Sequence, residues 1–251
     1  MNNKLISINS VFCEFFHKTL KSKQSKDPLR YLKKRGLELK ELNQFNLGYC
    51  DKNLTNSFIE ENGFLEKDLL ELGILKKSKD SGSIYPFFYN RLIFPIFDQY
   101  GKCVAFSGRR IDGIEDYKYI NSQSSKIFSK KRILYALNLN YDLLLKTKFV
   151  FLAEGFLDVI ALFKYDFRNV VCSMGTACTE EQVRILRRYV NKVIILYDGD
   201  NAGKEAAKKA EEILKKYVKV KKIFLPDEDD PDSFIGKYGV KKLKLYIKER
   251  I

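Results

Sequence analysis

The sequence predicts an α/β protein in two parts: an α+β subdomain over residues 1–147, then an α/β domain with a mainly parallel sheet over residues 148–251. Helical patterns followed by two adjacent strand-like runs fill the first part. In the second, short apolar runs alternate with amphipathic segments, a pattern typical of parallel strands joined by helices. Hydrophobic residues make up 45% of the chain, with 19 Phe and 15 Tyr, so it can build a substantial core.

The charge balance favours a polyanionic partner. Lys and Arg total 46 against 32 acids, a net charge of +14. Such an excess suits nucleic acid or an anionic membrane, unless it is only solvated surface. No apolar run is long enough to span a bilayer, and the start MNNKLISINS lacks the hydrophobic stretch of a signal peptide. We therefore expect a cytoplasmic protein with no membrane partner.

The residue types available limit the metal chemistry. The five cysteines are widely spread with no CxxC pair, and His17 is the only histidine. We therefore expect neither structural zinc nor a disulfide framework. Any metal must be held mainly by carboxylates, which suits Mg²⁺ or Mn²⁺.

The first part begins with a helical pattern. From about residue 10 to 77 we expect short helices separated by glycines. One of them lies in DPLRYLKKRGL, starting at Asp27 and Pro28 and ending at Gly36. The stretch RLIFPIFDQYGKCVAFSGRRI, residues 91–111, predicts two strands joined by a turn. The text after it, DYKYINSQSSKIFSKKRILYAL, is basic, aromatic and partly irregular.

The second part repeats a strand–helix order. Four apolar runs predict strands: KFVFLAEG, NVVCSM, KVIILYDGD and KVKKIFLP. Three segments between them predict helices: FLDVIALFKYD, TEEQVRILRRYV and AGKEAAKKAEEILKKY. Thr179 is placed as a helix N-cap, and Gln182 is placed to close a capping box. In such sheets, sites form at the carboxyl ends of the strands.

Acidic residues follow three of the four predicted strands. They are Glu154 in AEGFLD, Asp198 and Asp200 in YDGD, and Asp230 and Asp232 in DDPD. The plain interpretation is that the aspartates only form turns and cap helices, which Asp favours. The other interpretation is that carboxylates from several strands surround a hard cation, which offsets their mutual repulsion. Because all three motifs occur in this order, we favour the cation site.

This order of motifs resembles the Toprim domain, which has a glutamate after its first strand and DxD after a later one. The details are similar to the DnaG-type bacterial primase: AEGFLDVIAL, SMGTACTEEQVRILRR, YDGDNAGKEAA and LPDEDDPD, with YLKKRGL, FNLGY, NRLIFPIFDQYGKCVAFSGR and KYINS upstream. The resemblance covers about residues 10–240. It implies a Toprim-type fold for residues 148–251. It also implies RNA primer synthesis from ribonucleoside triphosphates on single-stranded DNA.

The resemblance implies roles for the acids. Glu154, Asp198 and Asp200 would hold Mg²⁺ or Mn²⁺ for two-metal nucleotidyl transfer. Three further catalytic acids would complete the site, directly or through water: Asp158, Asp230 and Asp232. Asp158 has an equal alternative, which is to serve the first turn of the helix that follows it.

The resemblance also implies a basic groove for template and nucleotide, because phosphates need cationic donors. The matching residues are Arg91, Arg109, Lys118 and Lys130. In IFSKKR the match falls either on Lys130 or on its neighbour. Asn121 in KYINS would orient nearby backbone or a phosphate. Three aromatic residues lie among these positions: Tyr117, Tyr119 and Phe128. They could stack on bases, but we expect core packing.

Family primases also carry a zinc-binding domain and a helicase-binding domain, and neither is matched in this chain. We expect a monomeric core. The replicative helicase would be a partner only through its binding domain, which is not matched in this chain. The resemblance therefore does not imply helicase-coupled priming. The alternative functions are a Toprim-type nuclease and a non-catalytic primase-like DNA-binding protein. The upstream motifs argue against the nuclease, and the complete set of acids argues against the non-catalytic protein.

Overall fold

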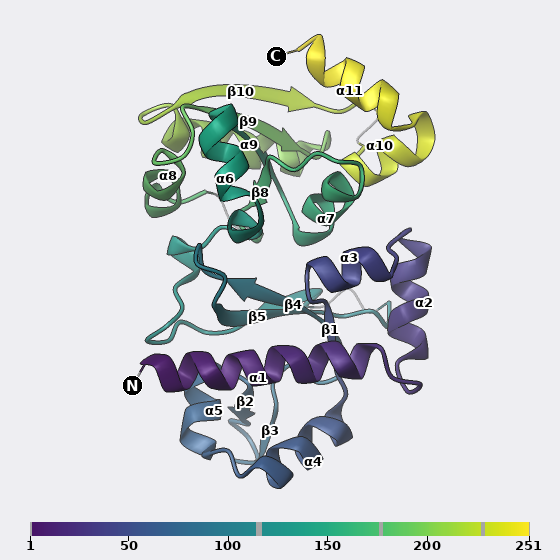
Figure 1. Cartoon of the computed structure of the whole chain (residues 1–251), viewed down its shortest axis with the longest axis vertical. Coiled ribbons are helices and arrows are strands. Elements are labelled where there is room, and N and C mark those ends of the chain that lie inside the picture. The colour runs from purple at the N-terminus through teal and green to yellow at the C-terminus, as the bar shows by residue number, and fades with distance from the viewer. Residues whose placement is uncertain (1, 114–116, 176–177, 227–228, 251) are drawn as a thin grey trace. The chain divides into compact units, whose positions relative to one another are not determined.

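The computed structural model describes residues 2–113, 117–175, 178–226 and 229–250 (Figure 1). The chain divides into two compact units, which we describe separately. The first comprises Met1–Phe97 and Lys102–Ser129, and the second comprises Asp98–Gly101 and Lys130–Ile251. The sequence also places a functional boundary after residue 147, between a nucleic-acid-binding subdomain and a catalytic domain, and that boundary stays a prediction. In the part of the chain described, no helix is long and apolar enough to cross a membrane.

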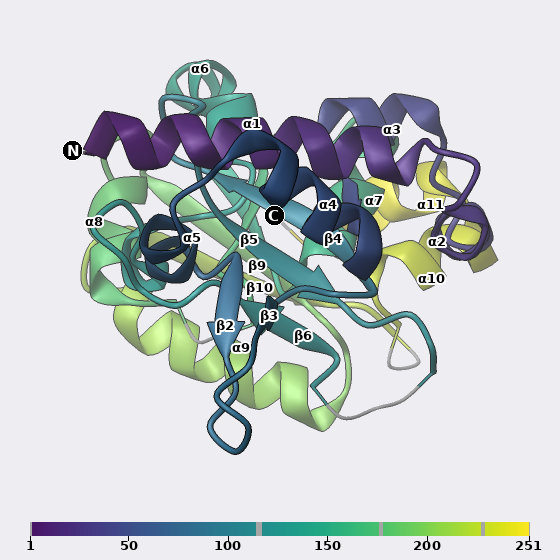
Figure 2. The same cartoon turned by 90° about the horizontal axis from the view of Figure 1, so that it is seen from below.

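The first unit combines helices with antiparallel strands, as the sequence predicts. Its helices are α1 (Asn2–Leu20), α2 (Lys26–Lys34), α3 (Leu39–Gln44), α4 (Lys52–Asn62) and α5 (Glu66–Leu72). Its antiparallel sheet has the order β1 (Gly48–Cys50), β4 (Arg91–Phe97), β5 (Cys103–Arg109) and β6 (Tyr119–Asn121). A separate hairpin pairs β2 (Leu75–Lys77) with β3 (Ile84–Pro86), and Figure 2 shows it projecting beside β6.

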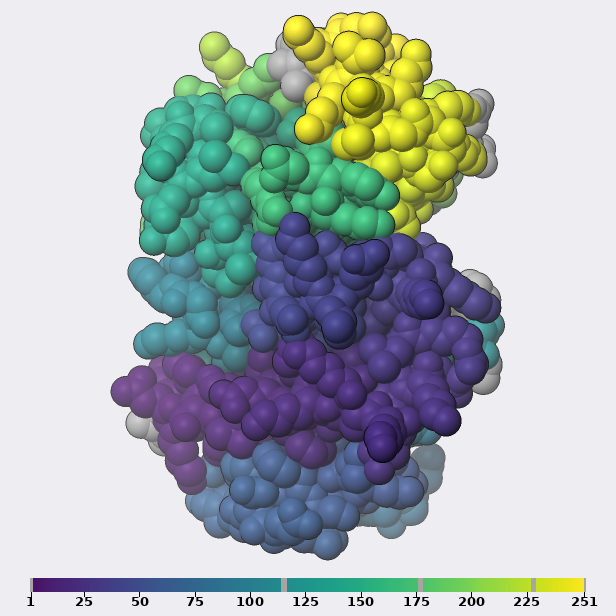
Figure 3. Space-filling model, turned by 45° about the vertical axis from the view of Figure 1, so that its right-hand side comes forward, coloured from purple at the N-terminus to yellow at the C-terminus, as the bar shows by residue number. Residues whose placement is uncertain are grey.

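Helix α1 supplies one wall of the first core. The Phe12 ring lies 5.5 Å from that of Phe58 on α4, and the Phe16 ring lies 5.4 Å from that of Phe106 on β5. Helix α1 therefore packs against both α4 and the sheet, and its residues form the purple band of the surface in Figure 3. Gly48 in β1 allows the close approach, because a Cβ there would lie 2.6 Å from the Cβ of Phe16.

Several predictions for the first unit are confirmed and some are wrong. The helix expected to end at Gly36 is α2, and Gly36 has a φ of +67°. The two strands of residues 91–111 are β4 and β5. The stretch expected to be helical also contains β1 and β2, and α1 is a long helix of 19 residues. Three-residue strands are too short to show an alternating pattern, which explains why they were missed.

The second unit is an α/β domain with a parallel sheet of order β10–β9–β7–β8. Its strands are β7 (Phe149–Ala153), β8 (Val170–Cys172), β9 (Lys192–Tyr197) and β10 (Lys219–Phe224). Its helices are η1 (Lys130–Arg132), α6 (Leu137–Thr147), α7 (Phe156–Lys164), α8 (Glu180–Leu186), α9 (Asn201–Leu214), α10 (Pro231–Tyr238) and α11 (Val240–Lys248). The four predicted strands and the three predicted helices are confirmed, as is the mainly parallel sheet.

The capping box predicted at the start of α8 is also confirmed. The Thr179 hydroxyl accepts from the Gln182 backbone N–H at 3.2 Å, and Gln182 Oε1 accepts from the Thr179 N–H at 2.9 Å. The same side chains bind the segment before α6. Thr179 donates to the Lys131 carbonyl, and Gln182 donates to those of Lys130 and Ile133. The box therefore holds Lys130 beside this sheet.

The order of the strands creates a crevice. The chain passes from β7 to β8 on one side and then to β9 on the other side of β7. Val150 and Leu152 of β7 and Val193 and Ile195 of β9 are fully buried, so both central strands lie deep in the core. In open α/β sheets, ligands bind at the carboxyl ends of strands where the order reverses. Here that place lies between the ends of β7 and β9.

Gly203 should be essential for the geometry of this edge. It lies in the first turn of α9, and a Cβ there would clash with the Asp198 carbonyl oxygen. We predict that Gly203→Ala lowers the free energy of unfolding by about 1–3 kcal/mol, because the Asp198 backbone must move. Chemical denaturation measures this.

Gly236→Ala is the matched control, because nothing lies within 4 Å of a Cβ at this glycine of α10. It should be neutral, or stabilising by up to about 1 kcal/mol, since Ala favours helix. Equal losses from both substitutions would contradict the proposed role of Gly203.

Candidate functional site: an acidic edge

The structure brings the predicted acids to one edge of the second unit. Glu154 directly follows β7 and Asp198 directly follows β9, and these two strands are neighbours in the sheet. The backbone N–H of Asp198 donates to the Glu154 carboxylate. Burial, and after it the charges of four nearby carboxylates, raise the pKa of Asp198 to about 8. They are Asp158, Glu154, Asp230 and Asp200.

Three of these acids have structural partners. Asp200 caps α9 by accepting from the Gly203 N–H at 2.6 Å, and Asp230 caps α10 by accepting from the Ser233 N–H at 2.7 Å. Asp158 accepts from the Gly155 N–H at 2.8 Å, so it serves the first turn of α7, one of its two predicted roles. Burial, and after it the charge of Asp230, raises the pKa of Asp158 to about 7.

Glu154 and Asp198 are different, because each has a buried oxygen that no described group satisfies. These atoms are Glu154 Oε2 and Asp198 Oδ1. Burial, followed by the charge of Asp200, also raises the pKa of Glu154. A buried acceptor without a donor costs free energy, and a buried carboxylate costs more. Turn formation and helix capping therefore do not account for these two side chains, whereas a bound cation would.

The donor set fits Mg²⁺ or Mn²⁺, since it consists of carboxylate oxygens. In the described ranges, however, no three His, Cys, Asp or Glu side chains are grouped closely enough to hold an ion.

Sequence analysis missed Asp229, which is only 3% exposed. It pairs with the Lys237 ammonium at 2.6 Å and accepts from the Ser233 hydroxyl at 2.8 Å. Burial opposes ionisation, but these two partners hold the pKa of Asp229 below its usual value. Asp229 therefore anchors α10 within the acidic edge. A lysine two helical turns after an aspartate run was the available signal. Asp232 is half-buried in the first turn of α10.

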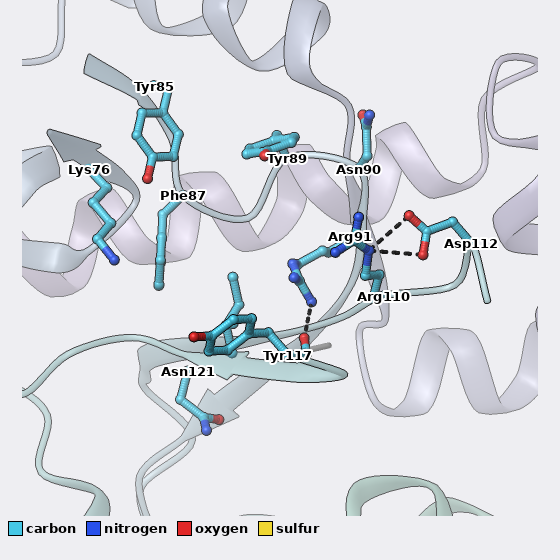
Figure 4. A pocket seen from close by; sticks show the side chains of 11 residues that line it. Lys76, Tyr85, Phe87, Tyr89, Asn90, Arg91, Arg110, Asp112, Tyr117 and Asn121 are labelled. Carbon is cyan, nitrogen blue, oxygen red and sulfur yellow. Dashed lines mark hydrogen bonds and ion pairs between the residues drawn. The ribbon is translucent and has the colours of Figure 1, made fainter. Parts of the chain in front are cut away.

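The predicted basic residues fall into different surroundings. Arg91 and Asn121 line one pocket of the first unit (Figure 4). Arg109 is 7% exposed, donates to the Tyr119 hydroxyl at 2.7 Å and lies over the rings of Tyr31 and Tyr119. Lys118 is exposed. Their roles in binding nucleic acid stay predictions.

Lys130 belongs to the second unit, in η1. Burial lowers the pKa of its ammonium, and the nearby Cys172 at the end of β8 partly offsets this effect. Its place near the strand ends agrees with a role beside the acids, which stays a prediction.

The aromatic residues among the basic positions do not share one role. Phe128 is 2% exposed and packs in the core, as expected. Tyr119 is half-buried, with its ring 5.9 Å from that of Phe94. For Tyr117 the expectation of core packing is wrong, because its side chain is exposed and its backbone has a φ of +51°.

Family comparisons agree with this architecture. A model of the N-terminal domain of the DNA primase catalytic core matches residues 15–140, and a Toprim-like model matches residues 151–235. The DNA primase of Clostridium acetobutylicum is 38% identical over 94% of this chain, and that of Aquifex aeolicus is 35% identical over 94%. The chain spans 39% and 47% of the lengths of these two relatives.

Solved structures show the same relationship. The Aquifex aeolicus primase structure with zinc-binding and RNA polymerase domains has a TM-score of 0.89 and 34% identity, covering 99% of this chain and 61% of that one. A DnaG primase catalytic domain bound to single-stranded DNA has a TM-score of 0.88 and 30% identity, covering 100% and 82%.

A parallel sheet with acids at the ends of neighbouring strands, preceded by an antiparallel subdomain, defines a Toprim-containing nucleic acid enzyme core. The Toprim domain implies use of a divalent metal. Within that class, the chain belongs to the DnaG-type DNA primase family and corresponds to its catalytic core.

The raised pKa of Asp198 predicts how metal-free stability depends on pH. With its pKa raised to about 8, the folded chain should keep this proton to near pH 8, whereas ordinary aspartate releases it near 3.8. The raised pKa therefore costs no folding stability below pH 3.8. The loss of stability grows between pH 3.8 and about pH 8, where only the unfolded chain ionises, and is constant above that pH. Discounting for partial exposure, Asp198→Asn should stabilise the protein by about 1–2 kcal/mol at pH 8.

Thermal unfolding in EDTA at pH 5 and pH 8 checks this, and the gain should be smaller at pH 5. Asp142→Asn is the control, since Asp142 is exposed on α6 and should give no gain at either pH. A destabilised Asp198→Asn variant at pH 8 would refute the argument.

Proposed function

We propose that this chain synthesises RNA primers on a single-stranded DNA template by metal-dependent nucleotidyl transfer. The observation that carries the proposal is the pair of unsatisfied carboxylate oxygens, Glu154 Oε2 and Asp198 Oδ1, in a Toprim domain attached to a primase-type N-terminal domain. Such oxygens suit a cation that stabilises negative charge during phosphoryl transfer.

The residues of the acidic edge would divide the work. Glu154, Asp198 and Asp200 would hold Mg²⁺ or Mn²⁺. When bound, the metal would activate the attacking 3′-hydroxyl and stabilise the departing pyrophosphate. Asp200 would also keep the start of α9 in place through Gly203. Asp230 and Asp158 would fix the neighbouring backbone and, with Asp232, contribute negative charge nearby.

The basic residues would bind the phosphates of template and nucleotide. Arg91, Arg109, Lys118 and Lys130 are proposed for this role, with Asn121 beside them. The ligand of the structural relative, single-stranded DNA, supports the choice of template. We further propose that the subdomain of residues 1–147 contributes this binding, that residues 148–251 contribute catalysis, and that the core acts as a cytoplasmic monomer.

Incorporation of labelled ribonucleotides on single-stranded DNA tests the proposal. Wild type with Mg²⁺ or Mn²⁺ should give short RNA products. Asp198→Asn should reduce them roughly 100-fold or more, because the metal contributes several kcal/mol to the transition state. Asp142→Asn should behave as wild type.

The same reactions, run on a denaturing gel for cleaved DNA, separate the alternative functions. Metal-dependent nicking without RNA product would indicate a nuclease. The absence of both products, from a folded protein that still binds DNA, would contradict catalysis by the isolated core.

Metal binding has a test that does not depend on activity. Mg²⁺ or Mn²⁺ should raise the unfolding temperature of the wild type at pH 8, since a ligand that binds the folded state stabilises it. Asp198→Asn should lose this rise, and Asp142→Asn should retain it. An equal rise in all three proteins would place the ion elsewhere.

A further inference from the structure

The turn between β9 and α9 is held partly by a distant segment of the second unit. The turn consists of Asp198, Gly199 and Asp200, and Asp200 fixes its far end by capping α9. Gly199 is buried, and its backbone N–H donates to the carbonyl of Asp229 at 3.4 Å. Because this hydrogen bond is long, its strength depends on where the segment before α10 holds that carbonyl.

The side chain of Asp229 determines that position. Its Oδ1 accepts from the Lys237 ammonium at 2.6 Å and from the Ser233 hydroxyl at 2.8 Å. Its Oδ2 is buried, and no described group satisfies it. Of the two partners of Oδ1, only Lys237 carries a charge. Removing the cation from a buried ion pair leaves an uncompensated charge, which strongly destabilises the arrangement around it.

The position of Lys237 on α10 suggests more than a helix-end charge. A lysine in the last turn of a helix interacts favourably with the helix dipole wherever its ammonium points. Here the ammonium instead reaches back along α10 to a residue that precedes the helix. Ser233 links the same residue to the helix cap, because its hydroxyl accepts from the Asp230 N–H at 3.1 Å. Helix α10 packs beside α7, which follows Glu154 (Figure 1).

We propose that Lys237 is a positioning residue for the metal site. Through Asp229 it holds the backbone of the turn at Gly199, and so fixes where the Asp198 and Asp200 carboxylates meet a divalent cation. The inference rests on the proposed function for the identity of that site. Residues that orient metal ligands without contacting the metal change its affinity by about 10–100-fold when they are removed.

Charge and position predict opposite effects for Lys237→Met. If charge alone mattered, loss of the ammonium would make the acidic edge more negative, and the variant would bind Mn²⁺ more tightly. Because the ammonium holds Asp229, we expect the variant to bind Mn²⁺ about tenfold more weakly than wild type. Electron paramagnetic resonance of free Mn²⁺ at pH 8 measures this affinity without DNA or nucleotide.

Matched variants separate the two effects further. Lys237→Arg keeps a cation that can pair with Asp229, and it should bind Mn²⁺ within about threefold of wild type. The double variant Asp229→Asn/Lys237→Met has no buried charge left to compensate, so it should bind Mn²⁺ more tightly than Lys237→Met alone. Lys241→Met removes an exposed lysine from α11 and should bind as wild type does.

Amide hydrogen exchange in EDTA tests the hold on the turn without any metal. In Lys237→Met, the Gly199 N–H should exchange about tenfold faster than in wild type, because its acceptor carbonyl is no longer held. The N–H of Ile195, within β9, should exchange at the wild-type rate. This comparison separates a local change at the turn from a loss of global stability.

Two results would overturn the proposal: Mn²⁺ affinity in Lys237→Met equal to or above that of wild type, and unchanged exchange of the Gly199 N–H. If Lys237→Met does not fold, the same two results in Lys237→Gln decide the question, since its amide can still donate to Asp229. A wild type that binds no Mn²⁺, but whose Gly199 exchange responds to the substitution, would contradict the metal site of the proposed function and not the hold on the turn.

Discussion

Repulsion between carboxylates at the carboxyl ends of β7 and β9 is the constraint on which the second unit depends. Glu154 and Asp198 are held there because their strands are neighbours in a parallel sheet buried on both faces. The helix caps at Asp200 and Asp230 place two more charges close by, and Gly203 lets α9 approach the Asp198 backbone. Each of these features stabilises the fold locally, yet together they concentrate negative charge. Such an arrangement is stable only if protons or a cation compensate it.

The first unit meets the opposite problem, since it must hold cations in partly buried places. Arg109 lies over two tyrosine rings, and Arg91 donates to backbone carbonyls at the end of the sheet. Burial lowers the pKa of Arg91, and the nearby Arg110 lowers it further. Guanidinium stays charged under such conditions, whereas lysine often does not. Arginine is therefore the residue suited to bind phosphate from within a folded surface.

Much of this was predictable from the sequence, for physical reasons that differ between elements. The central strands β7 and β9 of the second unit are apolar runs of five and six residues, and the capping box of Thr179 and Gln182 is a local motif. Strands β1, β2 and β6 have three residues each and leave no periodic signal. The role of Asp158 depends on whether its side chain turns back to the Gly155 N–H, and the position of Tyr117 depends on its bond with Arg91, 26 residues away. Such contacts are properties of the folded chain.

The topology of the parallel sheet also has a consequence for folding kinetics. Phe149 pairs with Lys192 across a crossover that contains α7, β8 and α8, so the pairing of β7 with β9 is a non-local contact, which is slow to form. We expect the repulsion between the acids at their ends to arise only with this pairing, and therefore late in folding. Interactions formed after the transition state affect the rate of unfolding more than the rate of folding. The metal-free core should therefore fold at nearly the rate of a neutral variant and open faster, and a bound cation would act mainly by lengthening the lifetime of the native state.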